Sequence, residues 1–277
     1  MEVNVRKADG SFAPYAPEKL RRSLVRAGAT ADEADAVAHD VELGLHDGMS
    51  TQTIYRQAFN KLQRQAKGPA ARYRLKRALF DLGPTGFPFE KFVARIFQAE
   101  GYHVQTGIQA EGRCVAHEID VWAERGDEVL LAECKFHHHA GQKSSIQVPL
   151  YFRARLVDVM ERRTAQGLPD GLVGWVVTNT RLSTEALQYA ACIGLRAMDW
   201  DSPDGHGLRD LVDRHHLHPV TCLSSLNRME KDRLITGGTV LCSEITEEVL
   251  RHRRIDQRKV PGVLTECSAL ARNGLMH

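Results

Sequence analysis

The sequence has no paired cysteines, the arrangement that a zinc ribbon or a disulfide-stabilised domain requires. Its six cysteines are scattered along the chain, at Cys114, Cys134, Cys192, Cys222, Cys242 and Cys267. This scatter is typical of reduced thiols in the cytosol. No apolar run approaches the roughly 18 residues that span a bilayer, and the first ten residues, MEVNVRKADG, contain no apolar signal-peptide segment. We therefore expect a soluble, cytoplasmic protein without a membrane partner.

The chain also lacks a large excess of charge of either sign. Lysine and arginine total 37 against 35 acidic residues, so the net charge is +2, and any surface for a polyanion must be local. The length of 277 residues is sufficient for two domains, with room for a third small unit. There is no internal repeat and no low-complexity stretch.

Residues 1–84 have the pattern of a small, mainly helical domain. Two short strands are expected first, at residues 2–7 and near Phe12, joined by a turn at Asp9-Gly10. Helices follow, the second capped by Thr30 and the third by Ser50 or Thr51; they are expected at 18–27, 31–44, 51–65 and 70–82. Residues 83–88 contain two glycines and two prolines, which end the helical pattern and mark a domain boundary.

Residues 85–202 predict an α/β domain, because helical periodicity now alternates with short apolar strands. After a helix at 89–101 and a polar loop, we expect two strands in 117–136, a helix beginning near Pro149, a strand at 172–178, a helix capped by Ser183 and a last strand at 195–200. Residues 203–277 predict a helical tail. Its helical segments, around 208–214, 227–236 and 246–253, are separated by Gly237-Gly238 and followed by Pro261-Gly262.

The most informative residues are Asp120, Glu133 and Lys135. A hairpin with a two-residue turn at Gly126-Asp127 places Asp120 directly opposite Glu133 on the neighbouring strand. Alternation along the second strand puts Lys135 on the same face as Glu133. Three ionisable groups are therefore expected to converge within a sheet whose flanks, VWA and VLLA, are apolar.

Two carboxylates that face each other across a strand pair repel by roughly 0.2 to 1 kcal/mol at an exposed site, and a bound divalent cation removes that cost. Oxygen ligands at an open site suit Mg²⁺ or Mn²⁺, which take further ligands from water and substrate phosphates. Asp120 and Glu133 are the predicted metal ligands. Lys135 is suited to orient an attacking water and to stabilise developing negative charge, which is the chemistry of phosphodiester hydrolysis.

Other residues are candidates for supporting roles. Glu90 opens the first helix of the α/β domain, from which a carboxylate reaches a metal directly or through water. Gln147, Tyr151 and Arg155 follow one another at intervals of four and share a helical face suited to a nucleic-acid backbone.

Plainer interpretations stay open for these patterns. A strand that ends in Glu-x-Lys is often only a solvated edge with a cross-strand ion pair. The histidines at 137–139 alternate in direction along a strand and cannot all bind one ion. The basic segment 251–259 is either a solvated helix end or a phosphate-contacting patch, and residues 222–240 are either half of a helix-hairpin-helix-like DNA grip or an ordinary helix and stop.

At HEIDVWAE and LLAECKF the sequence resembles the restriction-endonuclease-like, PD-(D/E)xK superfamily in its Mrr-type branch. The resemblance spans about 87–202 and includes FPFEKF and VVTNTRLSTEALQYA. It implies an α/β fold with a mixed central sheet flanked by helices, and Mg²⁺-dependent DNA cleavage by Glu90, Asp120, Glu133 and Lys135. Many Mrr-type proteins have Gln where this chain has Glu133.

Residues 3–82 resemble the ATP-cone domain of ribonucleotide reductases, on the motifs VRKADGSF, HDGMSTQTIYRQAFNKL and AARYRLKRALFDLG. The resemblance implies binding of ATP or dATP as an effector through Lys7, Lys19 and Thr51. The chain departs from the pattern at Ala8, Ala13 and Ala16, which leaves the preference between ATP and dATP open. The alternative is a degenerate cone that serves in oligomerisation.

The sequence therefore predicts a DNA endonuclease with nucleotide-dependent control, acting as a homo-oligomer. A hypothesis from another class is a nucleotide-responsive DNA-binding or regulatory protein whose nuclease domain is catalytically silent. A restriction enzyme, a repair nuclease and a junction resolvase share this chemistry, so the sequence does not decide among them.

Overall fold

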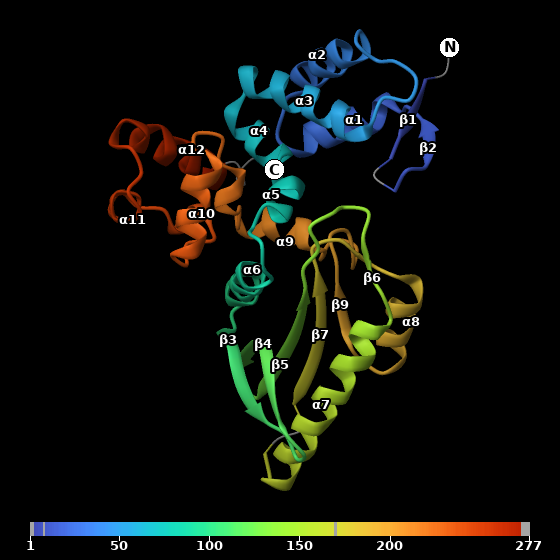
Figure 1. Ribbon diagram of the computed structural model, residues 1–277, viewed down its shortest axis with the longest axis vertical. Coiled ribbons are helices and arrows are strands. Elements are labelled where there is room, and N and C mark those ends of the chain that lie inside the picture. The colour runs from blue at the N-terminus through green and yellow to red at the C-terminus, as the bar shows by residue number, and fades with distance from the viewer. Residues whose placement is uncertain (1–2, 8, 169–170, 273–277) are drawn as a thin grey trace. The chain divides into compact units, whose positions relative to one another are not determined.

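The computed structural model describes residues 3–7, 9–168 and 171–272 (Figure 1). The chain folds into two compact units. The first comprises Met1–Ala78, Val220–Leu234 and Cys242–His277, and the second comprises Leu79–Pro219 and Ile235–Leu241. This division differs from the three consecutive ranges expected from the sequence, since most of the chain after Val220 belongs to the same unit as the N-terminal helices. Within the described residues, no helix is long and apolar enough to span a membrane.

The N-terminal part of the first unit is a short hairpin followed by helices, as predicted. Strands β1 (Asn4–Arg6) and β2 (Phe12–Pro14) pair antiparallel, and the helices are α1 (Pro17–Arg26), α2 (Ala31–Glu42), α3 (Thr51–Gln65), α4 (Lys67–Tyr73) and α5 (Leu75–Phe80). Thr30 and Glu33 form a capping box on α2, and Ser50 caps α3. The apolar faces of these helices form a core that includes Leu24, Val37, Val41, Ala58 and Leu62.

Two expectations about helices in this unit were wrong. The single helix expected at 70–82 is two, because a turn at Arg74 separates α4 from α5. The tail also contains a helix that was not predicted, α12 (Val260–Arg272), which begins at the Pro261-Gly262 position expected to interrupt the helical pattern. Pro261 is its second residue, where the missing N–H has no partner to lose, and α12 packs against α4. The other elements here are α10 (Arg228–Thr236), α11 (Glu247–His252) and the 3₁₀ turns η1 (Val220–Cys222), η2 (Cys242–Glu244) and η3 (Gln257–Lys259).

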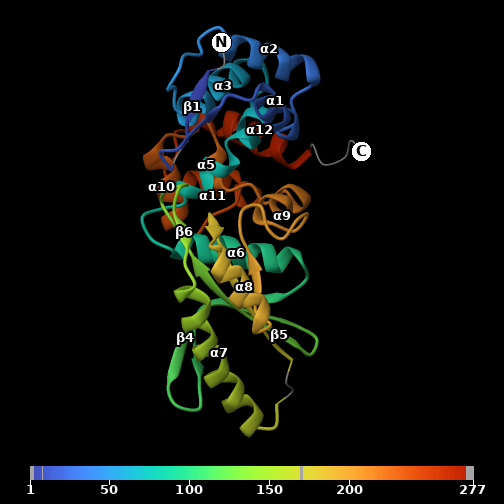
Figure 2. The same cartoon turned by 90° about the vertical axis from the view of Figure 1, so that its right-hand side faces the viewer.

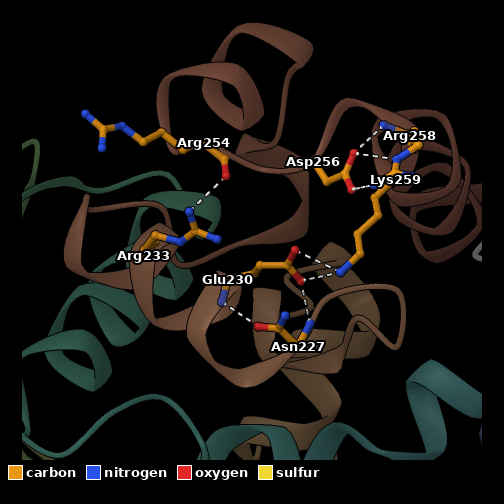
Figure 3. A network of polar contacts seen from close by, with 7 residues as sticks. All are labelled: Asn227, Glu230, Arg233, Arg254, Asp256, Arg258 and Lys259. Carbon is orange, nitrogen blue, oxygen red and sulfur yellow. Dashed lines mark hydrogen bonds and ion pairs between the residues drawn. The ribbon is translucent and has the colours of Figure 1, made fainter.

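A buried carboxylate organises the C-terminal helices of this unit (Figure 3). The side chain of Glu230 is 5% exposed and accepts from Lys259 Nζ at 2.8 Å through both oxygens. It also accepts the backbone N–H of Asn227 at 2.7 Å, while Asn227 Oδ1 caps the helix by accepting the N–H of Glu230. The same view shows Asp256 paired with Arg258. These contacts tie η3 to the start of α10.

The second unit is built on a mixed five-stranded sheet in the order β3-β4-β5-β7-β9. Strands β3 (His103–Glu111), β4 (Ala116–Arg125) and β5 (Glu128–Lys135) are antiparallel, whereas β7 (Leu172–Thr178) and β9 (Arg196–Met198) run parallel to β5. A separate parallel pair joins β6 (Lys143–Ser144) to β8 (Arg181–Leu182). The predicted class, α/β with a mixed central sheet flanked by helices, is confirmed.

Helices α6 (Phe87–Ala99), α7 (Gln147–Ala165), α8 (Thr184–Cys192) and α9 (Leu208–His215) complete this unit. The long helix α7 runs along the sheet (Figure 1), and α8 lies beside α7 (Figure 2) and packs against β9. Phe152, Leu156 and Val159 of α7 share a core with Leu131 and with Val176 of the sheet. Helix α6 packs against β3 and β4. The start of α6 and one face of α7 thus flank the strands that carry the acidic residues.

The polar loop expected after α6 is a strand, so that expectation was wrong. Strand β3 pairs with β4 along its whole length, from His103 opposite Glu124 to Glu111 opposite Ala116. It is the edge strand of the sheet and most of its side chains are exposed or half-buried. The sequence HVQTGIQAE therefore carries few of the apolar residues by which a buried strand is recognised.

Candidate active site

The β4–β5 hairpin has the register that its turn predicted. Gly126 adopts a positive φ of 58° in the two-residue turn, and Arg125 pairs with Glu128 and Val121 with Ala132. Asp120 and Glu133 lie one step beyond the last of these pairs. The Oδ2 of Asp120 accepts the backbone N–H of Cys134 at 2.7 Å, which fixes the carboxylate against β5.

Glu133 is paired with an arginine from α7. Its Oε2 accepts from the guanidinium of Arg155 at 2.5 Å, and the side chains are only 19% and 12% exposed, respectively. The guanidinium carbon of Arg155 also lies 5.5 Å from the ring centroid of Tyr151. The spacing of residues along α7 predicted that Arg155 lies on a helical face suited to a nucleic-acid backbone. It did not predict the ion pair between Arg155 and Glu133.

Glu90 joins this acidic cluster from the first turn of α6. Burial, followed by the negative charges of Asp120, Glu118 and Glu133, raises the pKa of Glu90 to about 7. Glu118 is an exposed residue of β4 that was not among the predicted site residues. Alternation along β4 puts it on the same face as Asp120, and that signal was available in the sequence.

The pKa values of the two predicted metal ligands are also raised. Burial raises the pKa of Glu133 to about 7, with Asp120 as the next cause, while Arg155 and Lys135 oppose the rise. Burial likewise raises the pKa of Asp120. Ionised carboxylates are disfavoured here because they are withdrawn from water and close to one another, so the site favours binding of a proton or a cation.

The donor set fits a magnesium-type ion. Asp120 and Glu133 offer carboxylate oxygens, the ligands that Mg²⁺ and Mn²⁺ prefer. Among the residues that the structure describes, no group of three or more acidic, histidine or cysteine side chains is placed to hold a metal ion. Two protein carboxylates suit an ion that keeps several waters and takes the rest of its coordination from phosphate.

Lys135 ends β5 and is exposed, with its backbone opposite Thr178 of β7. Its positive charge favours the ionised forms of both Asp120 and Glu133. Beyond it, Asn179 holds the chain with its side-chain amide, which accepts the N–H of His137 and donates to the His137 carbonyl, both at 2.8 Å. The pairing of β5 with β7 is thus extended by a side chain, and this role of Asn179 was not predicted from the sequence.

The histidines after Lys135 are not a metal centre. Burial, followed by the charge of Lys135, lowers the pKa of His137. Its Nε2 lies 2.9 Å from the buried Ser144 Oγ. The ring of His138 instead packs edge-on against Phe136 at 4.9 Å between centroids.

The candidate nucleic-acid face of α7 borders a shallow hollow. Gln147 is exposed, Tyr151 is 66% exposed, and Arg155 is turned inward to Glu133. A hollow of about 380 Å³ is lined by Cys114, His117, Tyr151, Ala154, Arg155, Val157, Asp158 and Glu161. Asp158, one of these lining residues, accepts the backbone N–H of Cys114 at 2.9 Å and contacts His117 Nε2 at 2.8 Å.

The basic segment 251–259 is largely neutralised within its own unit. Of its five cations, Arg251 pairs with Glu247, Arg258 with Asp256 and Lys259 with Glu230. These contacts favour the interpretation of this segment as part of the packing of the C-terminal helices.

In the first unit, the structure brings two of the three candidate nucleotide residues to the start of α3. Arg6 of β1 forms a parallel bridge with Ser50, so Lys7 and Thr51, which follow these two residues, lie next to the α3 N-terminus. That helix end carries partial positive charge and free N–H groups, which suit a phosphate. Lys19 is an exposed residue in the first turn of α1.

Comparisons with known proteins match three consecutive parts of the chain to three protein families. Family models match at residues 3–79 (ATP cone domain), 84–202 (Restriction endonuclease) and 218–271 (AF1548-like, C-terminal). A protein of Archaeoglobus fulgidus described as "Uncharacterized protein" is 33% identical over 180 residues, which cover 63% of this chain and 97% of that protein.

Two solved structures are also similar to this chain. The crystal structure of the protein of unknown function AF1548 has a TM-score of 0.55 at 30% identity, covering 69% of this chain and 96% of that one. The MspJI restriction endonuclease in complex with a 27-mer oligonucleotide has a TM-score of 0.33 at 12% identity, covering 71% of this chain and 39% of that one.

Proposed function

Because the chain belongs to the same family as the Archaeoglobus fulgidus protein and carries an ATP cone domain ahead of a restriction endonuclease domain, we propose that it is a metal-dependent DNA endonuclease under the control of adenine nucleotide. The observation that carries the proposal is the convergence of Asp120 and Glu133 at the end of the β4–β5 hairpin. Lys135 favours the ionised forms of both carboxyl groups, and the charges of both raise the pKa of Glu90.

In this proposal Asp120 and Glu133 hold Mg²⁺ or Mn²⁺, which supplies charge neutralisation at the scissile phosphate and a more acidic water. The ammonium of Lys135 orients the attacking water and stabilises the negative charge that develops on the phosphate. Glu90, with a pKa near neutral, is suited to accept a proton during the attack. Gln147 and Tyr151 contact the DNA backbone from the exposed face of α7.

The ATP cone supplies the proposed control. Lys7, Lys19 and Thr51 bind the phosphates of ATP or dATP, with the α3 N-terminus as a further source of positive potential. The occupied cone then sets the activity of the nuclease domain or the assembly of a homo-oligomer. The test is cleavage measured with ATP, with dATP and without nucleotide.

Plasmid nicking with a Lys135→Ala variant tests the catalytic proposal. We expect the wild-type protein to nick supercoiled plasmid with Mg²⁺ or Mn²⁺, and Lys135→Ala to lose nicking while it retains salt-dependent DNA binding. Lys143→Ala, which removes an exposed lysine of β6 in the same unit, is the matched control and should nick normally. Wild-type protein that binds DNA but cleaves it with neither ion would instead support a catalytically silent, regulatory protein.

A further inference from the structure

The ion pair between Arg155 and Glu133 occupies an atom that the proposed chemistry needs. Glu133 Oε2 is engaged by the guanidinium at 2.5 Å, and both side chains are largely shielded from water. A guanidinium is permanently charged and cannot act as a metal ligand. While it stays on Glu133, it both uses one carboxylate oxygen and repels a second cation at the same position.

The side chain of Arg155 has a second position available, in the hollow beside α7. Arg155 lines this hollow together with Tyr151 and Ala154. The ring of Tyr151, over which the guanidinium already lies at 5.5 Å, is 66% exposed. A side chain that leaves Glu133 for this side would reach the exposed face of α7, on which the proposed function places the DNA backbone. Arginine binds phosphate through paired N–H groups as well as it binds a carboxylate.

We propose that Arg155 exchanges Glu133 for a DNA phosphate, so that DNA binding frees Glu133 for the divalent cation. This inference rests on the proposed function and assigns Arg155 a coupling role within that site. Without DNA, Arg155 neutralises Glu133 and the site binds a cation weakly. With DNA, the guanidinium moves to the phosphate and Glu133 becomes a metal ligand. Because linkage is reciprocal, the cation strengthens DNA binding by the same factor.

Mn²⁺ binding to the full chain, followed by electron paramagnetic resonance, tests this coupling directly. The titration uses the Lys135→Ala background to prevent cleavage, with and without a short DNA duplex, and subtracts the Mn²⁺ that the duplex binds alone. The part of the Mn²⁺ signal that is lost when Asp120→Asn is added to this background is the part that comes from the site. We expect the duplex to raise Mn²⁺ affinity about 5- to 150-fold, the usual range of coupling between two sites.

Arg155→Gln should remove the coupling and change Mn²⁺ binding both without and with DNA. We expect it to bind Mn²⁺ more tightly than its parent without DNA, and to gain little or nothing when the duplex is added. Arg162→Gln, an exposed arginine in the last turn of α7, is the matched control and should keep the parent's response. Arg155→Lys should give an intermediate response, because it keeps the charge but loses the paired donors. Arg155→Lys also decides the question if Arg155→Gln fails to fold.

The proposal is overturned if the duplex leaves Mn²⁺ affinity unchanged in the parent, or if Arg155→Gln and Arg155→Lys both keep the full increase. Wild-type plasmid nicking, run in parallel, separates this outcome from failure of the proposed function. Nicking without coupling removes only the role of Arg155, whereas absence of both nicking and Asp120-dependent Mn²⁺ binding removes the nuclease assignment as well.

Discussion

The carboxylate of Asp120 accepts the backbone N–H of Cys134 through Oδ2 at 2.7 Å. This bond joins β4 to β5 where their regular pairing has ended at Val121 and Ala132. It holds the acidic side chain beside the residue that follows Glu133 and precedes Lys135. Since this bond uses Oδ2 of Asp120, Oδ1 remains available to bind a cation. Asp120 therefore has a structural role and a chemical one, and variants can separate them.

Asp120→Ala should destabilise the second unit more than Asp120→Asn does. Alanine leaves the N–H of Cys134 without its acceptor, at a cost of about 1–3 kcal/mol, whereas the oxygen of asparagine can still accept it. All three tryptophans, Trp122, Trp175 and Trp200, belong to this unit, so urea unfolding followed by tryptophan fluorescence reports on it. Equal free energies of unfolding for the two variants would contradict the structural role.

Without a divalent cation, the acidic cluster should make stability fall as the pH rises. The pKa values of Glu90 and Glu133 are about 7 in the folded protein, against 4.5 as the ordinary value. Between these values the folded state binds more protons than the unfolded state, so stability is lost as pH rises from about 4.5 to 7. Below this window both states are protonated, and above it the loss is complete.

Thermal unfolding between pH 5 and pH 8 checks this dependence. Glu90→Gln should lose less stability than the wild type over the window, because one of the two groups has been removed. Glu111→Gln, an exposed residue of β3, is the control and should follow the wild type. Mg²⁺ should raise the unfolding temperature more at pH 8 than at pH 5, where protons occupy the carboxyl groups. A Glu90→Gln profile parallel to that of the wild type would contradict the account.

In the ATP cone, Lys7→Ala and Lys19→Ala should each weaken ATP binding. A charge-assisted hydrogen bond contributes about 1.5–3 kcal/mol, which corresponds to roughly a 10- to 100-fold increase in Kd. Arg26→Ala is the matched control, since Arg26 is an exposed cation in the last turn of α1 and should leave the affinity unchanged. Calorimetric titration with ATP and dATP measures these effects. Uniform loss of affinity in all three variants would indicate a non-specific effect of charge.

The parts of the site that could be predicted are those set by local geometry. A two-residue turn at Gly126-Asp127 fixes the register of a hairpin, and alternation then fixes which side chains share a face. The caps at Thr30 and Ser183 were likewise predicted, and Ser50 was one of two candidates, because a capping side chain bonds to N–H groups only a few residues away.

The parts that escaped prediction depend on contacts between distant segments. Arg155 lies 22 residues after Glu133, and helical spacing alone cannot show that its side chain turns to the sheet. The amide of Asn179 meets His137 only because β7 runs parallel to β5. The edge strand β3 has few buried side chains, so its sequence lacks the apolar pattern of a strand. It forms a strand because it pairs with β4.

The most direct measurement of the central claim is Mg²⁺-dependent nicking of supercoiled plasmid by the wild-type protein and by Asp120→Asn, with the folded state of each confirmed by tryptophan fluorescence. We predict that the wild type converts the plasmid to open circles as Mg²⁺ is added, and that folded Asp120→Asn loses about 100-fold or more of the rate, the scale expected when several kcal/mol of metal-dependent stabilisation are removed. Equal nicking by the two folded proteins would contradict the assignment of Asp120 and Glu133 as the metal site.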